Sequence, residues 1–298
     1  MALQGIFPAL VTPFNPDESV SLAAVRENIH LYNQTKVAGY VVLGSTGESV
    51  LLSREESDSI LTAAKEAASA SKVLVAGTGA ESTAETIVRT KRAAALGYPF
   101  ALVKTPYYYK PAYRAENYLQ HYRAVADASP IPVLLYSVPV FTGVTLETAE
   151  ILALAQHPNI VGIKDSSGSI QRIGEVVSSA PPSFTVFTGG AAVIYPALAV
   201  GAKGAILALA AALPEKCAEV FELFQNGRHD EARQLQHALV HASKRIASEN
   251  GIAGVKYAMD LRGYRGGVPR RPLLPLTEEN KRSIAALVSQ LHPAAARV

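Results

Sequence analysis

One pattern repeats through most of the sequence: a short apolar run, then a stretch with helical periodicity. The eight apolar runs are residues 5–14, 39–45, 72–79, 100–106, 132–139, 160–166, 184–190 and 204–211, and the clearest helical stretches are 21–36, 53–70, 81–96, 114–128 and 145–156. Apolar strands that alternate with helices are typical of a parallel sheet covered on both faces. Eight such units predict an α/β fold of the (β/α)8 TIM-barrel type.

An open Rossmann-like sheet is the alternative fold, but the turn after the first apolar run reads TPFNPDES and contains no G-x-G-x-x-G motif. Beyond residue 212 the pattern becomes purely helical, over 214–225, 228–247, 250–261 and 277–292, with an irregular connector at 262–276. We therefore expect residues 1–225 to form the barrel. Residues 226–298 should form a helical extension packed on it.

Composition narrows the class of protein. A length of 298 residues suits one barrel of about 250 residues with an extension. A net charge of +3, from 28 basic and 25 acidic residues, is too balanced to indicate a nucleic-acid or membrane partner. The one cysteine, Cys217, excludes an internal disulfide and suits core packing in a reducing compartment. With no basic leader and no apolar run of about 18 residues, a cytoplasmic location is expected.

Polar residues at strand ends are the first candidates for chemistry, because catalytic groups of a barrel collect at its carboxyl-terminal face. The turn GSTGE (44–48) could bind an anion or simply cap a helix. Tyr136 could act as an acid or base or simply pack with a hydrated hydroxyl. The seven histidines are scattered, each is expected at the surface, and neither H-E-x-x-H nor C-x-x-C occurs, so no metal site is predicted.

Two lysines end apolar runs, Lys164 in NIVGIKDSSG and Lys104 in FALVKTP. A buried, unpaired ammonium is costly, so each lysine must reach water, pair with a carboxylate, or exist partly as the free amine. The free amine is the form that attacks a carbonyl group. Strand position alone does not distinguish the two lysines as the nucleophile.

Four motifs in order, GSTGE, TPYYYKP (105–111), LLYSVPVFTG (134–143) and GIKDSSG (162–168), resemble the dihydrodipicolinate synthase/N-acetylneuraminate lyase family. The similarity extends from about residue 5 into the C-terminal helices. The resemblance implies a class I aldolase that binds pyruvate and an aldehyde without a cofactor. It also implies a cytoplasmic homotetramer built from two tight dimers.

The resemblance also implies roles for individual residues, and it favours Lys164 over Lys104 as the lysine that forms an imine with pyruvate. Tyr136 would shuttle protons and Ser45 would relay them. The remaining implied site residues are Thr46 for the pyruvate carboxylate, Tyr108 reaching into a neighbouring subunit, and Gly189 and Ile206 lining the pyruvate pocket.

The aldehyde partner is where the sequence departs from one branch of the family. Dihydrodipicolinate synthases carry an arginine two residues after the motif proline, whereas this chain has Phe141. The motif variants are closer to 4-hydroxy-2-oxoglutarate aldolases, which produce pyruvate and glyoxylate. In that branch Ser166 is a candidate contact for the distal carboxylate of the substrate. Lys104 or Arg114 could also replace the arginine of the synthases. Dihydrodipicolinate synthesis from aspartate semialdehyde, sugar-acid aldolase activity and a non-catalytic pyruvate-binding role are the alternatives.

Overall fold

The computed structural model describes residues 3–292 and has a nearly closed barrel of eight parallel strands at its centre. The strands are β1 (Gly5–Pro8), β2 (Gly39–Val42), β3 (Val73–Gly77), β4 (Phe100–Lys104), β5 (Val133–Ser137), β6 (Ile160–Asp165), β7 (Thr185–Thr188) and β8 (Gly204–Leu207). Each strand pairs with its sequence neighbour, and β8 pairs with β1. Two backbone hydrogen bonds connect β1 and β2. The Ala38 N–H donates to the Ile6 carbonyl (2.8 Å), and the Leu10 N–H donates to the Val41 carbonyl (2.9 Å). The predicted barrel is confirmed.

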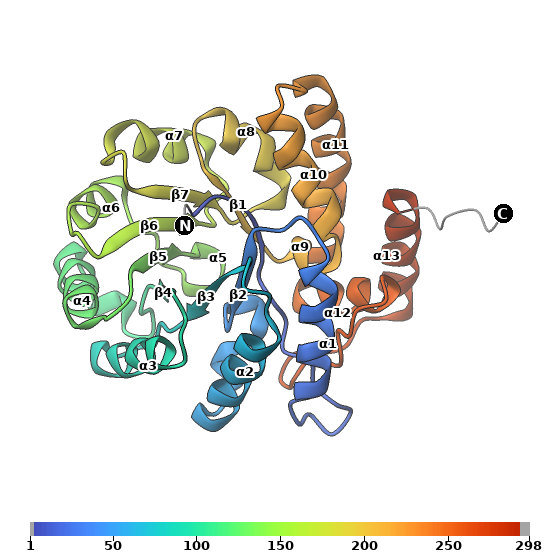
Figure 1. The fold of residues 1–298 in the computed structure, drawn as a ribbon, viewed down its shortest axis with the longest axis horizontal. Helices are drawn as coiled ribbons and strands as arrows, with labels where there is room; N and C mark the ends of the chain where they lie inside the picture. The colour runs from blue at the N-terminus through green and yellow to red at the C-terminus, as the bar shows by residue number, and fades with distance from the viewer. Residues whose placement is uncertain (1–2, 293–298) are drawn as a thin grey trace.

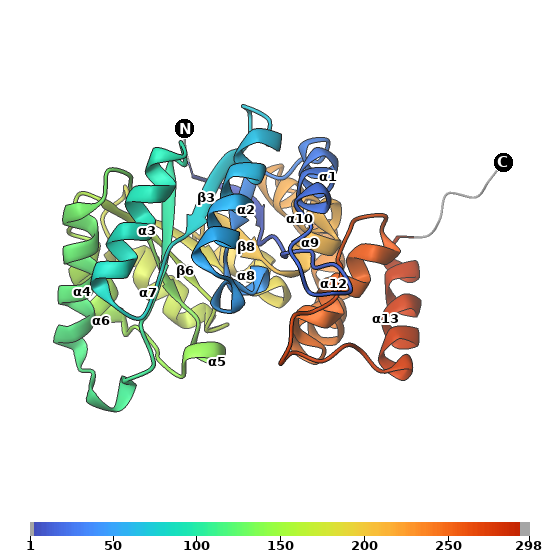
Figure 2. The same ribbon diagram turned by 90° about the horizontal axis from the view of Figure 1, so that it is seen from below.

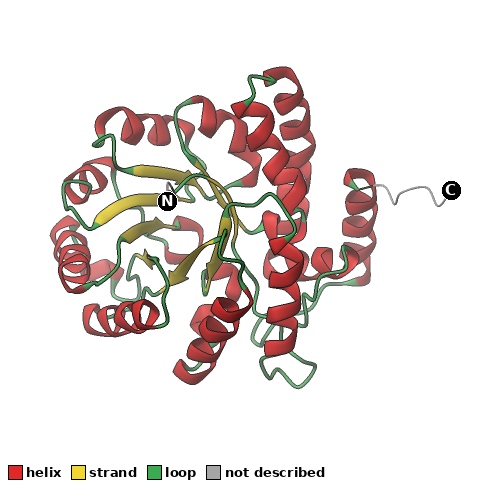
Figure 3. Cartoon of the chain, in the orientation of Figure 1, coloured by secondary structure: helices red, strands yellow, loops and turns green. Residues whose placement is uncertain are grey.

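Helices surround the strands on the outside of the barrel (Figures 1 and 3). The main helices are α1 (Leu22–Asn33), α2 (Arg54–Ala67), α3 (Thr83–Ala95), α4 (Ala115–Ala128), α6 (Thr148–Leu154), α7 (Ile170–Ser179), α8 (Ile194–Ala199) and α10 (Pro214–Gln225), with the short helices α5 (Pro139–Thr142) and α9 (Leu209–Ala212). Serine hydroxyls cap the N-termini of several of them. Ser53 and Glu56 form a reciprocal capping box on α2. The five helical stretches predicted first agree with α1, α2, α3, α4 and α6, with shorter ends.

All eight predicted strands extend beyond the observed ones, and two of them, 5–14 and 204–211, do so by four or more residues. The run 204–211 is a strand only to Leu207, and its last residues belong to α9. The neighbouring β1 ends at Pro8, which pairs with Leu207, so a longer β8 would have no partner there. The run 5–14 likewise leaves the sheet after Pro8, and its continuation passes under the turn at 44–48, where the Thr12 hydroxyl donates to the Gly47 carbonyl (2.6 Å).

Side chains alternate between the inside and the outside of the barrel along each strand. The inward-facing cluster is apolar and consists mainly of Phe7, Val41, Val75, Leu102, Leu134, Tyr136, Phe187 and Ile206. The outward-facing residues Val103, Leu135 and Ile163 instead pack with the outer helices. Each large buried side chain contributes about 1.5–3 kcal/mol to folding. This alternation decides which residues at the strand ends face the barrel interior.

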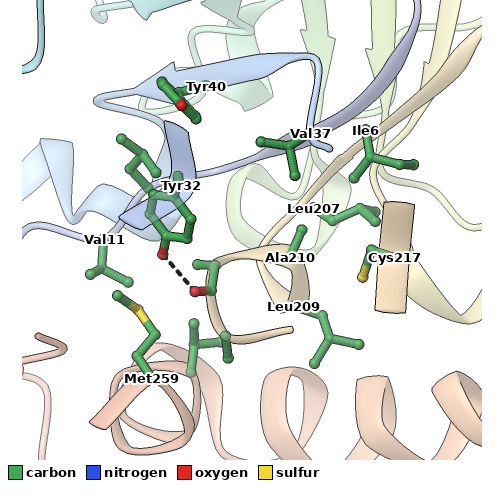
Figure 4. Close-up of a cluster of buried hydrophobic side chains, with 14 of the residues drawn as sticks. Ile6, Val11, Tyr32, Val37, Tyr40, Leu207, Leu209, Ala210, Cys217 and Met259 are labelled. Atoms are coloured by element: carbon green, nitrogen blue, oxygen red, sulfur yellow. Dashed lines mark hydrogen bonds between the residues drawn. The ribbon is translucent and has the colours of Figure 1, made fainter. Parts of the chain in front are cut away.

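A helical extension follows the barrel and lies along one side of it (Figure 2). It comprises α11 (His229–Ala242), a π-helical segment (Ser243–Ser248), α12 (Gly251–Leu261) and α13 (Glu278–Leu291). Met259 of α12 lies in the core cluster that also contains Tyr32, whose hydroxyl donates to the Ala211 carbonyl (2.5 Å; Figure 4). The predicted division at residues 225 and 226 stays a prediction. Within residues 3–292 no helix is both long and apolar enough to cross a membrane.

A buried ion pair connects this extension to the turn at 44–48. The Lys256 Nζ lies 2.6 Å from the Glu48 carboxylate, and both side chains are almost completely buried. The same carboxylate accepts the Arg270 N–H (2.9 Å), while Lys256 also donates to the Val268 carbonyl (2.6 Å). Burial lowers the pKa of Lys256, and the Glu48 charge opposes that shift. Glu48 has a left-handed backbone (φ 54°), an unfavourable conformation for a residue other than glycine, so its contacts must hold it there.

Replacing Lys256 with methionine should lower the free energy of unfolding by about 3–5 kcal/mol, because it leaves the Glu48 carboxylate buried without a cation. Urea unfolding followed by circular dichroism measures the loss. The double variant Glu48→Gln/Lys256→Met is the control and should lose clearly less, since it buries no charge. A Lys256→Met protein as stable as wild type would mean that the pair does not join the extension to the turn.

Candidate active site

Three polar side chains lie side by side at the carboxyl-terminal ends of neighbouring strands. Lys104 on β4 pairs in register with Tyr136 on β5, which pairs with Lys164 on β6. Lys104 and Tyr136 each lie two residues beyond an inward-facing leucine, Leu102 and Leu134 respectively. Alternation therefore turns these side chains towards the barrel interior, at the face where barrel enzymes carry out their chemistry.

Lys164 is buried, with 4% of its surface exposed, and its Nζ lies 4.2 Å from the centre of the Tyr136 ring. In the part of the chain that the structure describes, no carboxylate lies within 4.0 Å of this nitrogen. Lys104, by contrast, pairs with Glu81 at 3.1 Å. A nucleophile needs an amine whose lone pair is available. Of the two strand-end lysines, Lys164 is the better placed to provide one.

The Tyr136 hydroxyl faces the turn after β2. It lies 3.4 Å from the Ser45 Oγ, within reach of a weak hydrogen bond. Catalytic hydrogen bonds are often long before a substrate binds. The neighbouring Thr46 is buried in the same turn, which forms a 3-10 helix over Ser45–Gly47. The predicted residues Lys164, Tyr136, Ser45 and Thr46 are thus brought together.

Contacts with the first segment of the chain and with the C-terminal extension hold the turn at 44–48 in place. A Cβ atom at position 47 would lie 3.1 Å from the Leu10 carbonyl oxygen, so glycine permits the close contact with the first segment of the chain. The hydrogen bond from Thr12 to Gly47 and the Glu48–Lys256 ion pair fix the two sides of the turn. The catalytic candidates Ser45 and Thr46 are therefore positioned by residues distant in sequence.

A second buried ion pair supports the loop after β6. The Asp165 carboxylate lies 2.9 Å from the Arg172 Nε and accepts the Ser167 N–H (2.7 Å). Ser166 lies directly against Gly189, where any Cβ atom would collide with the Ser166 Oγ. The side chain of Ile206 belongs to the inward-facing cluster with Tyr136. Ser166 and Gly189 thus lie together, and Ile206 lies beneath the site in the barrel interior.

The model of the Dihydrodipicolinate synthetase family matches residues 2–291. The chain belongs to this family. A probable 4-hydroxy-2-oxoglutarate aldolase, mitochondrial, from Emericella nidulans is 40% identical over 92% of this chain and 91% of its own length. A 4-hydroxy-tetrahydrodipicolinate synthase from Geotalea uraniireducens is 37% identical over 96% and 98%. A solved dihydrodipicolinate synthase from Acinetobacter baumannii, complexed with pyruvate, is 31% identical, with a TM-score of 0.92 over 97% of this chain and 99% of that one.

The family resemblance seen in the sequence is therefore confirmed, and the protein is an enzyme, a pyruvate aldolase or lyase of this dihydrodipicolinate synthetase family. Its relatives include both aldolases and synthases, so membership leaves the second substrate open. A cytoplasmic location stays a prediction, and one relative is named as mitochondrial. No three His, Cys, Asp or Glu residues gather as possible metal ligands within residues 3–292. Independence from metals and cofactors also stays a prediction for this family member.

Tyr108 is the predicted site residue that does not join the others within one chain. It is 72% exposed, and its ring contacts Tyr109 edge to face with the centroids 5.0 Å apart. The backbone N–H groups of Tyr107 and Tyr108 both donate to the Glu81 carboxylate at 2.9 Å. Partial burial raises the pKa of Glu81, but these bonds and the Lys104 charge outweigh it and lower the pKa overall. Glu81 therefore fixes the loop that carries Tyr108.

A cavity of about 260 Å³ opens beside Ser45. Lys104, Tyr107, Phe141 and Thr142 are among the residues that line it. Phe141, at the position where the synthases of the family have an arginine, is 62% exposed. The cavity is thus next to the predicted catalytic hydroxyl of Ser45, and Phe141 places no charge in its wall.

Several buried polar groups were not predicted from the sequence. His121 was expected at the surface but is only 5% exposed, because it lies on the inner face of α4 beside Tyr122. Burial, with a smaller effect of the Lys104 charge, lowers the pKa of His121 to about 4. The partners Arg172 and Lys256 were missed as well. Both lie among the buried residues of α7 and α12, and a charged residue on an apolar helix face was the available signal.

Proposed function

We propose that this enzyme is a Schiff-base aldolase in which Lys164 forms an imine with pyruvate. The observation that carries the proposal is a buried lysine without a carboxylate partner, 4.2 Å from the ring of Tyr136. The amine attacks the keto carbon, and the carbonyl oxygen leaves as water. The protonated imine then stabilises negative charge on the pyruvate methyl carbon, so that a carbon–carbon bond at that carbon can form or break. This chemistry needs no cofactor.

The neighbouring residues take the roles that their positions suit. The Tyr136 hydroxyl and the Ser45 Oγ, which lie 3.4 Å apart, move the proton that carbonyl attack and bond cleavage require. Thr46 and its turn bind the pyruvate carboxylate. Gly189 and Ile206 shape the pyruvate pocket, and Ser166 contacts the far end of the longer substrate. Tyr108 completes the proton relay in a neighbouring subunit.

The second substrate of the proposed reaction is glyoxylate, so that the enzyme cleaves 4-hydroxy-2-oxoglutarate. Two observations support it: Phe141 stands where the synthases have an arginine, and the Emericella nidulans relative has this name. The second candidate is dihydrodipicolinate synthesis from aspartate semialdehyde, which the names of several relatives and solved structures favour.

A homotetramer built from two tight dimers completes the proposal. Tyr108, Tyr109, Val140 and Phe141 are large apolar or aromatic side chains with more than half of their surface exposed. Several such side chains exposed on the segments that follow β4 and β5 are typical of a surface that another subunit covers.

Borohydride should trap pyruvate on Lys164. Reduction of the imine would add a lactyl-type mass to the peptide that contains Lys164, measured by mass spectrometry after digestion. The variant Lys164→Arg should show no labelled peptide although its circular dichroism spectrum is unchanged. Labelling of Lys104 in the wild-type enzyme would overturn the assignment.

The enzyme should cleave 4-hydroxy-2-oxoglutarate more efficiently than it condenses pyruvate with aspartate semialdehyde. A missing charge-assisted hydrogen bond costs about 1.5–3 kcal/mol, which corresponds to roughly a 10- to 100-fold loss of kcat/KM for the synthase reaction. Phe141→Arg should raise synthase activity, whereas Val140→Arg, the control with the same charge one residue away, should not. Efficient synthesis by wild type with no cleavage would refute the glyoxylate assignment and leave the imine mechanism intact.

Mixing two inactive variants should restore activity if the site is shared between subunits. Tyr108→Phe protein lacks the relay hydroxyl and Lys164→Ala lacks the amine, so a mixed dimer would contain one complete site. Aldolase assays after subunit exchange measure the recovery. Tyr109→Phe is the control and should remain active by itself. Native mass spectrometry first demonstrates that the subunits have exchanged. If activity is then not recovered, the result contradicts a shared site.

A further inference from the structure

Lys104 is a cation beside the site to which the proposed mechanism gives no role. It lines the 260 Å³ cavity together with Ser45, Phe141 and Thr142. Among the described residues that line this cavity, it is the one lysine or arginine. Its side chain is 13% exposed, so its charge acts largely inside the cavity and not in bulk water.

The backbone and its neighbours fix this lysine in place. Lys104 is the last residue of β4 and is in register with Tyr136. Gly79 makes room for it, since a Cβ atom there would lie 2.6 Å from the Lys104 backbone nitrogen and 2.8 Å from its Cγ. The ammonium also lies 4.8 Å from the centre of the Tyr107 ring. A cation on a strand end, with neighbours on two sides, is well ordered for binding.

The Lys104 ammonium still has hydrogen-bonding capacity. It has three donors, and one of them reaches Glu81 at 3.1 Å. Glu81 in turn shares its negative charge with the N–H groups of Tyr107 and Tyr108. Glu81 is also partly exposed to water, which weakens its hold on the lysine. Lys104 can therefore accept a second anion in the cavity.

We propose that Lys104 binds the carboxylate of the second substrate, and so makes the enzyme specific for short aldehyde acids. This inference rests on the proposed imine at Lys164. Lys104 and Lys164 flank Tyr136 on strands that lie about 4.8 Å apart, so their backbones are separated by about 10 Å. In the five-carbon substrate, three bonds of about 1.5 Å separate the keto carbon from the distal carboxyl carbon. A substrate of this length is short enough to lie between the two strands, with its distal carboxylate on the β4 side of Tyr136.

The cleavage step then has a defined place for each product. The bond between carbons 3 and 4 breaks, and its electron pair stays with the pyruvate half as the enamine. The proton of the hydroxyl on carbon 4 passes to Tyr136, so carbon 4 becomes the aldehyde carbon of glyoxylate. The enamine later takes up a proton at carbon 3. Throughout, the Lys104 ammonium neutralises the carboxylate that leaves with glyoxylate.

Two other nearby cations are less suitable. Arg114 is exposed at the start of α4 and does not line the cavity. Lys110 donates to the Thr142 carbonyl at 3.2 Å and is also absent from the cavity lining. Lys110→Met is therefore a matched control that removes one positive charge nearby without changing the proposed contact.

The test compares two small aldehydes that differ in charge, glyoxylate and glycolaldehyde, as acceptors for pyruvate. Wild type, Lys104→Met, Lys104→Arg and Lys110→Met are assayed for kcat/KM with each. Lys104→Met should lose roughly 10- to 100-fold with glyoxylate and less than about threefold with glycolaldehyde. Lys104→Arg should keep most of the preference for glyoxylate, and Lys110→Met should match wild type. Borohydride trapping with pyruvate alone should label Lys164 equally in all four proteins.

The outcomes separate this inference from the proposed function. Absence of trapping in wild type would refute the imine mechanism itself. Normal trapping with an equal loss for both aldehydes would show that Lys104 merely supports the site. Normal trapping with no loss for glyoxylate would show that another group binds the carboxylate. Trapping reduced in Lys104→Met alone would place Lys104 on the pyruvate side; each of these last three results would overturn the inference.

Discussion

The cost of burying an amine is the constraint on which this site depends. Lys256 offsets this cost by pairing with the Glu48 carboxylate at 2.6 Å, and Lys104 pairs with Glu81 at 3.1 Å. Lys164 is also buried, with 4% of its surface exposed, yet no carboxylate of residues 3–292 lies within 4.0 Å of its Nζ. Its nitrogen lies 4.2 Å from the centre of the Tyr136 ring instead of against a carboxylate, and in this environment we propose that it acts as the nucleophile. The carboxylate partners thus distinguish Lys256 and Lys104, which are paired, from Lys164, for which we propose the imine.

The register of the parallel strands places Lys104 and Lys164 on either side of Tyr136. Because β4, β5 and β6 pair in register and side chains alternate, one row of inward-facing positions holds Lys104, Tyr136 and Lys164. The loops add what strands cannot, namely the Ser45 hydroxyl and the turn around it. That turn is held in place because the C-terminal extension supplies Lys256 and Arg270 to Glu48. The extension also lines the cavity beside Ser45, through Ile252, Pro272 and Leu273.

The sequence predicted what depends on local periodicity and motif. All eight strands, the helical extension, and the convergence of Lys164 with Tyr136 and Ser45 agree with the structure. Strand ends were misjudged at 204–211, since the length of a strand depends on where its neighbours end. The buried environment of His121 and the Arg172 and Lys256 ion pairs were missed for a related reason. Each depends on a partner or a covering element that periodicity along one helix does not identify.

The position of the second cation has a physical consequence for specificity. Lys104 belongs to a strand whose backbone is hydrogen-bonded into the barrel, so its backbone position is fixed relative to that of Lys164. In the proposed mechanism, this position fixes the distance between the imine carbon and the carboxylate that Lys104 binds. Aspartate semialdehyde carries its carboxylate two carbons further from the aldehyde than glyoxylate does. With Phe141 uncharged and Lys104 in register with Tyr136, the proposed mechanism therefore favours the shorter acid.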